Sequence, residues 1–457
     1  MAVMNTLNIA HTGLKTAAYG IEVTAQNVNN ASTEGYVRRR VVQQPRAPTR
    51  GNRGVYRGSG VAVTSVNRSI DRNVVARTLE ALGDEAQARA SHESLQVLET
   101  GFREGDLSSL ADRFDQFFDS LSELTMEPAD YGLRQSVLNA GEAFAGSLNR
   151  AAQATVDTVA DIESRIEDEI GDINETLEAI QALDRQISES DAVQGPADLL
   201  DHRDALMEQV AQKIGVDIEY KANGQVNLFV GGHAIVQDVH IRELTVSGSA
   251  GSLEVQLSVD ASVVTVTGLI GGELGGLVAA RSVAQDTGDS LNTFAEDFAD
   301  AFNTQHALGY DRTSAVGGDF FTFGGSAAIS FALDTSLAAD SDLVAVAGAP
   351  SAEVGDGDNL TALLAVEESL LFDGGTKASR DFISSVYSDL GSEVRGFEID
   401  AETYAAAYSD LNSLKTAISA VDLDDEAVNL IRYQASYEAA ARVVSVADEM
   451  FETLMRM

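Results

Sequence analysis

The chain has 457 residues and a formal net charge of −40, with 44% hydrophobic and 22% charged residues. It contains no cysteine, which excludes disulfides, thiol nucleophiles and cysteine metal sites. No apolar run approaches the ~20 residues of a transmembrane helix. The first residues also lack the basic stretch and continuous apolar core of a cleaved secretory signal.

The charge is unevenly distributed. Residues 1 to 77 hold eleven Lys/Arg against three Asp/Glu, so the rest of the chain is strongly acidic. The simplest interpretation is an acidic body kept soluble by self-repulsion. The alternative is that the basic segment binds acidic surface of the same chain or of a neighbour. Nucleic acid is a poor candidate partner for this chain, because the acidic excess repels its phosphates.

Both ends of the chain show apolar residues at alternating spacings of four and three, which is typical of a coiled-coil seam. The N-terminal seam consists of Val3, Leu7, Ala10, Leu14, Ala17, Ile21, Thr24, Val28 and Ala31. The C-terminal seam consists of Leu430, Tyr433, Tyr437, Ala440, Val444, Ala447, Phe451 and Leu454. We expect the two seams to pack against each other and against neighbouring copies; two ordinary amphipathic helices on one core are the alternative. Asp422 and Asp424 are placed to cap the second helix.

The middle of the chain alternates between helical and strand patterns. An apolar stripe from Val159 to Ile187 predicts a long helix, and a second helix is expected from about Ala197 to Lys213. Residues 216 to 267 change to a period of two, typical of strands. Helix is expected again from Gly275 to about Ala307. Residues 317 to 360 are weakly strand-like, and helix resumes from about Lys377, with breaks expected near Asp400 and Asp422.

These patterns predict a mainly α fold with β-rich inserts, an α+β chain with terminal coiled-coil helices and a small outer β domain. We expect residues 1–75 and 415–457 to form the terminal domain. A helical body is expected from 76–215, 268–315 and 370–414, hence from both halves of the chain. The β-rich domain is expected at 216–267, with a weakly strand-like insert at 316–369.

Catalytic patterns are weak. The sequence has none of the common metalloprotease, nucleophile-elbow or nucleotide-binding motifs, and its six histidines are scattered. GDGDN at 355–359 lacks the twelve-residue frame of a calcium loop and is interpreted as a solvated turn. In DLLDHRD at 198–204, Asp201 and Asp204 lie one helical turn apart, which favours a helix-surface ion network over an acid/base pair. We therefore expect no enzyme activity, no metal and no cofactor.

The stretch NVNNASTEGYVRR, residues 27–39, carries the one specific motif of the chain. Its pattern closely resembles the N-terminal signature of the flagellar rod, hook and hook-associated protein family. The matching residues are Asn27, Asn30, Thr33, Gly35, Tyr36, Arg38 and Arg39. Segments 198–218, 223–237, 271–311, 317–321 and 419–457 resemble the hook–filament junction members of that family. Residues 322–375 do not align with the pattern, so an outer domain is expected to be reduced or missing.

The resemblance implies a structural subunit that joins hook to filament through helical self-assembly, with its termini lining the inner tube. It implies export through the flagellar type III apparatus without signal cleavage, and an extracellular place in the flagellum. The implied partners are the hook protein, the second hook–filament junction protein, other copies of the chain, and an export chaperone at the C-terminal region. Nucleic acid and membrane are not expected partners. Alternatives are another axial protein, such as the hook protein or the second junction protein, or a secreted coiled-coil adhesin or enzyme.

In the residues themselves, the motif explains how the N-terminal helix ends. Asn and Thr side chains compete for backbone hydrogen bonds, Gly35 can close the helix, and Tyr36 can anchor the turning chain. Arg38, Arg39 and Arg40 then follow as the densest basic cluster of the chain. We expect them to pair with acidic surface; an unpartnered basic turn is the alternative.

Overall fold

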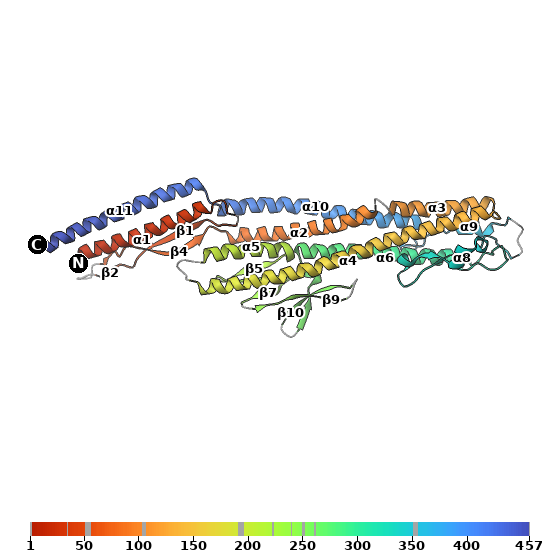
Figure 1. The fold of residues 1–457 in the computed structure, drawn as a ribbon, viewed down its shortest axis with the longest axis horizontal. Helices are drawn as coiled ribbons and strands as arrows, with labels where there is room; N and C mark the ends of the chain where they lie inside the picture. Colours follow the sequence, from red (N-terminus) through yellow and green to blue (C-terminus); the bar gives the residue numbers. More distant parts are fainter. Residues whose placement is uncertain are drawn as a thin grey trace.

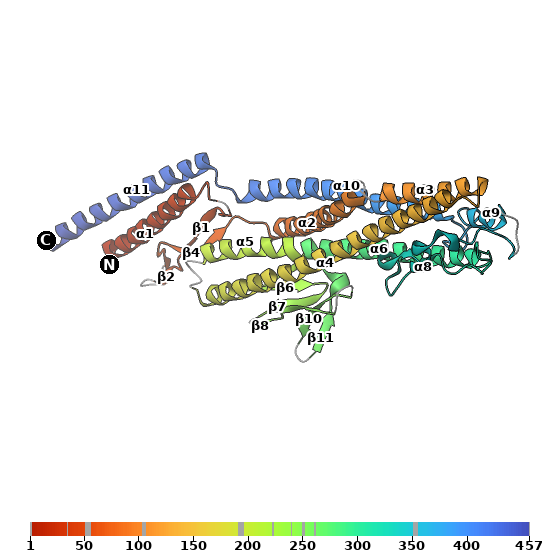
Figure 2. The ribbon, with the colours of Figure 1, turned by 45° about the vertical axis from the view of Figure 1, so that its right-hand side comes forward.

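The computed structural model describes the chain except residues 1, 34, 51–55, 103–106, 191–195, 222–223, 239, 249–251, 260–261, 351–354 and 457. The molecule is a long rod with both termini at one end, and a small β lobe projects from its side (Figures 1 and 2). The predicted class, mainly α with small β inserts, is confirmed.

The long helices come from both halves of the chain. They are α1 (Ala2–Asn29), α2 (Arg72–Gly101), α3 (Leu107–Met126), α4 (Tyr131–Glu189), α5 (Ala197–Ile214), α6 (Gly272–His306), α10 (Ser379–Ser419) and α11 (Leu423–Arg456). The chain thus leaves the terminal end in α1, runs through the body, and returns in α10 and α11 (Figure 1).

Helices α1 and α11 form an antiparallel pair. Gly13 lies opposite Ala440, Gly20 lies under the ring of Tyr433, and the Asn27 amide bonds the Glu426 carboxylate. These contacts repeat every seven residues on both helices, as in a coiled coil. A Cβ atom on Gly20 would lie 2.6 Å from the Tyr433 ring, so glycine is what permits this close approach.

The contact seam of α1 differs in part from the one predicted by the apolar pattern. Ala10, Ala17 and Thr24 of the predicted seam are buried. However, Gly13, Gly20 and Asn27 make the intervening contacts, whereas Leu7, Leu14 and Ile21 remain half-buried and Val28 is exposed. The pattern marked large apolar side chains, but two helices approach closest where their facing residues are small. The larger side chains are therefore left at the edge of the pair.

A twisted ribbon of strands runs beside α1. Its strands are β1 (Arg39–Pro45), β2 (Thr49–Arg50), β3 (Tyr56–Arg57) and β4 (Val61–Arg68). Strand β1 pairs antiparallel with β4, and β2 with β3. The ribbon rests on α1, where the Thr12 hydroxyl accepts a hydrogen bond from the Val61 N–H.

The body is a helical bundle with an aromatic end. Helices α2, α4, α5, α6 and α10 pack along the rod, and α3 packs on α4 (Figure 1). At the end far from the termini, phenylalanines from α3, α4 and α6 form one cluster; Phe114, Phe144 and Phe298 have ring centroids 5.5–5.6 Å apart. Such rings combine a large buried area with favourable edge-to-face contacts, which makes this end a firm core.

The β lobe consists of two small antiparallel sheets on the side of α4. One has the order β5 (Asp217–Tyr220), β6 (Val226–Val230), β7 (His233–Gln237), β8 (His240–Ile241); the other has the order β11 (Ser262–Thr265), β10 (Glu254–Val259), β9 (Leu244–Ser247). The Asn174 side chain of α4 holds Leu244 by two backbone hydrogen bonds of 2.9 and 3.0 Å. The lobe is therefore fastened to the long helix.

Two local expectations differ from the structure. Helix α10 runs unbroken from Ser379 to Ser419, because Asp400 is an exposed residue that the helix tolerates; the break comes only before α11. The stretch 316–369, expected to be weakly strand-like, holds two strands of two residues and several short helices. These elements are β12 (Phe321–Thr322), α7 (Ala327–Ser330), β13 (Ala332–Leu333), α8 (Thr335–Ala339), η4 (Ser341–Leu343) and α9 (Asp358–Leu364). The short helix η3 (Thr267–Leu269) lies earlier in the chain, just before α6.

Candidate functional site: the joint between terminal helices and body

The motif at residues 27–39 ends α1 and turns the chain into β1. The Asn30 amide donates to the Gln26 carbonyl at 3.0 Å, and the Thr33 hydroxyl donates to the Asn30 side-chain oxygen at 3.3 Å. Gly35 has φ +75°, a left-handed geometry that disfavours other residues. The side chains thus replace the helical hydrogen bonds that are lost as the chain reverses.

Asn27 is the centre of this joint. Its side chain is 1% exposed and makes four hydrogen bonds. Its oxygen accepts the Arg39 N–H at 3.0 Å and the Tyr36 hydroxyl at 2.9 Å. Its nitrogen donates to the Arg39 carbonyl at 2.9 Å and to Glu426 Oε2 at 3.0 Å. One amide therefore connects α1, the returning strand β1 and the start of α11.

Arg38 holds the corner between α10 and α11. Its backbone N–H donates to the Ser419 carbonyl at 2.9 Å, at the end of α10. Its guanidinium pairs with Glu426 Oε1 at 2.7 Å and with Asp425 at 3.2 Å. The predicted cap by Asp422 is confirmed, since its carboxylate accepts the Asp424 N–H at 2.9 Å. Asp424 itself lies in the first turn of α11 rather than at the cap.

Arg39 and Arg68 fasten the strands to α5. Arg39 pairs with Asp198 at 2.5 Å and with Asp201 at 2.8 Å, and its guanidinium lies 4.7 Å from the centre of the Tyr36 ring. Arg68 pairs with Asp201 at 2.8 Å and with Asp204 at 2.5 Å. Two arginines and three carboxylates thus alternate as a ladder between β1–β4 and one face of α5.

The ladder continues into the body. Arg203 of α5 pairs with Asp184 of α4 at 2.9 Å, and both side chains are almost completely buried. The second oxygen of Asp184 accepts the Val226 N–H of β6 at 3.1 Å. A continuous polar path therefore leads from α11 through the strands and α5 to α4 and the β lobe.

The electrostatics of the joint favour charged arginines. Their carboxylate partners raise the pKa of Arg38 and Arg39, although burial alone would lower it. Burial raises the pKa of the Asp201 carboxyl, against the opposing effect of Arg68 and Arg39. A buried ionic contact is directional and costly to break on one side only. The joint can therefore fix the angle between the terminal pair and the body.

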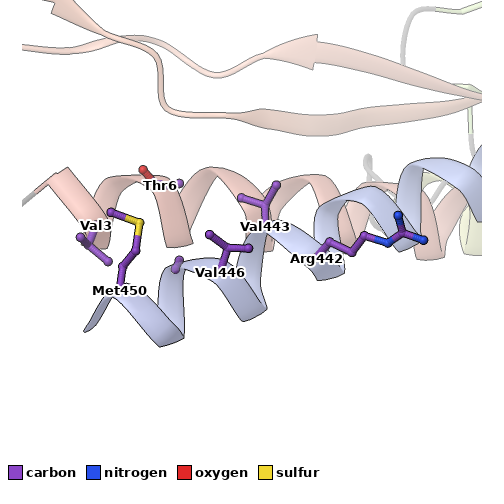
Figure 3. A pocket seen from close by; sticks show the side chains of 7 residues that line it. Val3, Thr6, Arg442, Val443, Val446 and Met450 are labelled. Carbon is purple, nitrogen blue, oxygen red and sulfur yellow. The ribbon is translucent and has the colours of Figure 1, made fainter. Parts of the chain in front are cut away.

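The ends of the terminal pair expose an apolar surface. Between Val3 of α1 and Val443, Val446 and Met450 of α11 lies an apolar hollow of about 280 Å³ (Figure 3). Val446, Met450 and Phe451 are each 53–54% exposed, and Tyr437 is 40% exposed. An exposed apolar patch of this kind marks an interaction surface.

The structure brings most residues of the motif together. Asn27, Tyr36, Arg38 and Arg39 meet at the joint, with Asn30, Thr33 and Gly35 in the turn beside it. Arg40 is exposed and takes no part. Of the C-terminal seam, Leu430, Tyr433 and Val444 are half-buried, and the Tyr433 ring lies against Gly20 of α1. Tyr437 and Phe451 are exposed, and the side chain of Leu454 lies outside the described residues.

Two features were missed or misjudged from the sequence. Glu426 was not singled out, because a carboxylate in the first turn of a helix is already explained by the helix dipole and does not by itself point to an arginine. The ion network at Asp201 and Asp204 was expected within the helix surface, but its arginines come from β1 and β4. Residues 39 and 68 lie far from α5 along the chain, so helical spacing cannot reveal the pairing.

Ion pairs and hydrogen bonds between charged and polar side chains hold the joint together. Within the described part of the chain, no group of three or more His, Cys, Asp or Glu residues is arranged to hold a metal ion. The described residues also contain no helix that is long and apolar enough to cross a membrane. The site consists of paired charges and hydrogen bonds whose chemical effect is to hold elements in place. The fold and site together define a structural subunit of an assembly.

Comparison with known proteins shows that this chain is similar to flagellar proteins. A model of the flagellar hook-associated protein FlgK helical domain matches residues 95–321, and one of the flagellar basal body rod FlgEFG protein C-terminal region matches residues 416–457. Flagellar hook-associated protein 1 of Escherichia coli K12 is 24% identical over 553 aligned residues, covering 99% of both chains. The Bacillus subtilis protein of that name is 25% identical over 503, covering 98% of this chain and 97% of its own.

A solved structure agrees with these sequence matches. The flagellar hook junction protein FlgK from Burkholderia pseudomallei superposes with a TM-score of 0.65 at 15% identity, over 76% of this chain and all of that one. The chain belongs to the flagellar hook-associated protein 1 (FlgK) family. The Escherichia coli alignment spans 553 positions against the 457 residues of this chain, so about 100 aligned positions have no counterpart here.

Proposed function

We propose that this chain is the structural subunit that joins hook to filament in the bacterial flagellum, through helical self-assembly and contacts to neighbouring axial proteins. The observation that carries the proposal is the apolar surface left exposed along the α1–α11 pair. Leu7, Leu14 and Ile21 lie half-buried at the edge of the pair, and Val446 and Phe451 are more than half exposed. A single copy therefore leaves much of this apolar surface uncovered.

The joint supports the same function. A subunit that transmits torque from hook to filament needs a fixed angle between its terminal helices and its body. The Asn27 centre and the arginine–carboxylate ladder supply that connection through buried, directional contacts. Terminal helices pack in the inner tube in this proposal, while the β lobe faces outward.

The proposed partners are the hook protein on one side, the second hook–filament junction protein on the other, and further copies of this chain. Before assembly, an export chaperone covers the C-terminal region, whose apolar residues on α11 would otherwise be exposed. Export through the flagellar type III apparatus places the subunit outside the cell. The absence of cysteine agrees with this route, because no disulfide has to be undone for a chain threaded in an extended form.

The test uses two exposed valines on helices. Val446→Asp places a charge on the proposed assembly surface, whereas Val97→Asp does so on α2; these valines are 54% and 70% exposed. Neither change buries a charge within one copy, so both proteins should fold and be exported. We expect Val446→Asp to abolish retention at the hook tip and release filament subunits into the medium, while Val97→Asp supports normal filaments. Normal filaments with Val446→Asp would contradict the proposal.

A further inference from the structure

The ribbon of residues 39–68, here called the arginine arm, has an unusual charge. It contains seven arginines and no acidic residue in a chain of net charge −40. Arg39 and Arg68, at its root, are held by the carboxylates of α5. Farther out, Arg40, Arg46, Arg50 and Arg57 are exposed, and none of the four forms an ion pair with any residue that the structure describes.

These four arginines lie on a narrow two-stranded surface. Arg50 pairs across the ribbon with Tyr56, and Thr49 with Arg57, so two guanidiniums share the outer part of the arm. Like charges held close together repel, and a complementary acidic surface removes that cost. The arm extends from the joint along α1, and its outer part lies beyond the end of α4 (Figures 1 and 2). The acidic body of the same copy is therefore out of its reach.

A complementary surface exists on α4. Asp161, Asp168 and Glu175 follow at seven-residue intervals on one exposed face, with Glu167 and Glu178 beside them. Among the described residues, none of these five carboxylates has a cationic partner. Seven helical residues span about 10 Å. Six residues of extended chain, from Arg40 to Arg46, span about 20 Å. The distance between these two arginines is therefore close to twice the distance between successive carboxylates on α4.

We propose that the arginine arm of one copy docks on the acidic face of α4, residues 161–178, of a second copy. This inference rests on the proposed function, because it needs copies arranged side by side. It adds to that function an electrostatic contact at larger radius, separate from the apolar contacts of the terminal helices. Such a contact sets the register between copies, since complementary charges specify geometry more than they add affinity.

The absence of cysteine allows a direct test by disulfide trapping. Gln44→Cys places a thiol on the exposed side of the arm, and Gly171→Cys places one between Asp168 and Glu175, where an added Cβ meets no other atom. Gly396→Cys on α10 is the matched control, because it is also an exposed helical glycine with free space. Flagella that carry Gln44→Cys with either partner are treated with diamide as oxidant, and disulfide-linked dimers are measured on a non-reducing gel.

We expect at least about fivefold more dimer from the 44–171 pair than from the 44–396 pair. Arg46→Glu should lower the yield of the 44–171 pair, and adding Asp168→Lys should restore it. One molar salt during oxidation should also lower it, because the Debye length falls to about 3 Å. Equal yields from the two cysteine pairs, or a yield indifferent to the charge changes, would overturn the inference.

A separate measurement distinguishes this result from failure of the proposed function. Immunolabelling of the same flagella shows whether the chain lies between hook and filament. If the label lies there but the two cysteine pairs give equal dimer yields, the arm contact is refuted and the proposed function is retained. If the chain without cysteine substitutions is not labelled between hook and filament, the proposed function itself is refuted.

Discussion

Replacing Asn27 by alanine removes the side chain on which the joint depends. The change deletes bonds to the Arg39 N–H, the Arg39 carbonyl, the Tyr36 hydroxyl and the Glu426 carboxylate. A neutral bond contributes ~1 kcal/mol net and one to an ionised group ~1.5–3 kcal/mol. Water can replace the bond to half-buried Tyr36, so two neutral bonds and one ionic bond remain, and we expect a loss of about 4 kcal/mol in the stability of the joint.

Hydrogen exchange measures this loss locally. The Arg39 amide is protected by Asn27, and it exchanges when the joint opens. A loss of about 4 kcal/mol corresponds to roughly 700-fold faster exchange, because every ~1.4 kcal/mol is a factor of ten. The same acceleration should extend to the start of α11, which Glu426 anchors, and should leave α4 unchanged.

Asn30→Ala is the matched control within the same motif. Asn30 bonds only its own turn, at the Gln26 carbonyl and the Thr33 hydroxyl, and we expect its loss to accelerate exchange less than about fivefold. Comparable exchange in the two variants would refute the interpretation of Asn27 as the centre of the joint. Acceleration confined to residues 26–36, without α11, would refute the connection through Glu426.

Two further predictions concern the body. Arg203→Met leaves Asp184 buried without its cation and should lower the free energy of unfolding by ~3–5 kcal/mol. Denaturant titration followed by circular dichroism measures this loss. Arg185→Met, at an exposed position of α4, is the control and should change the free energy of unfolding little. His306 is buried with Nδ1 on the Gly318 carbonyl and Nε2 accepting a backbone N–H, and burial lowers its pKa below 6.5. The unfolded chain therefore takes up this proton first, and stability should fall as pH drops below about 6.5; His306→Asn should flatten that dependence, and an unchanged slope would contradict it.

The long helices were predictable because their apolar residues recur at helical spacing over many turns. The Val159–Ile187 stripe and the two terminal patterns each correspond to a helix in the structure. The contact face of α1 was less accessible to the same reasoning. A hydrophobic pattern is recognised from large apolar side chains. The closest contacts of α1 with α11 are instead made at Gly13 and Gly20, where the absence of a side chain lets the two helices approach.

The joint could be only half predicted. The motif located its first half, since Asn27 and Arg39 are twelve residues apart and their roles follow from local chain reversal. Its other half comes from Asp201 and Glu426, which lie 162 and 399 residues from the motif residues they bind. No local periodicity encodes such a pairing, and the 71 acidic residues of the chain leave many equally plausible partners.

The measurement that most directly tests the central claim is deletion of the gene, followed by electron microscopy of the cell surface and assay of filament subunits in the medium. If this chain joins hook to filament, deletion should leave complete hooks without filaments and should release filament subunits into the medium. Expression of the intact chain should restore filaments. Filaments of normal length and number in the deletion strain, or loss of the hooks themselves, would contradict the account.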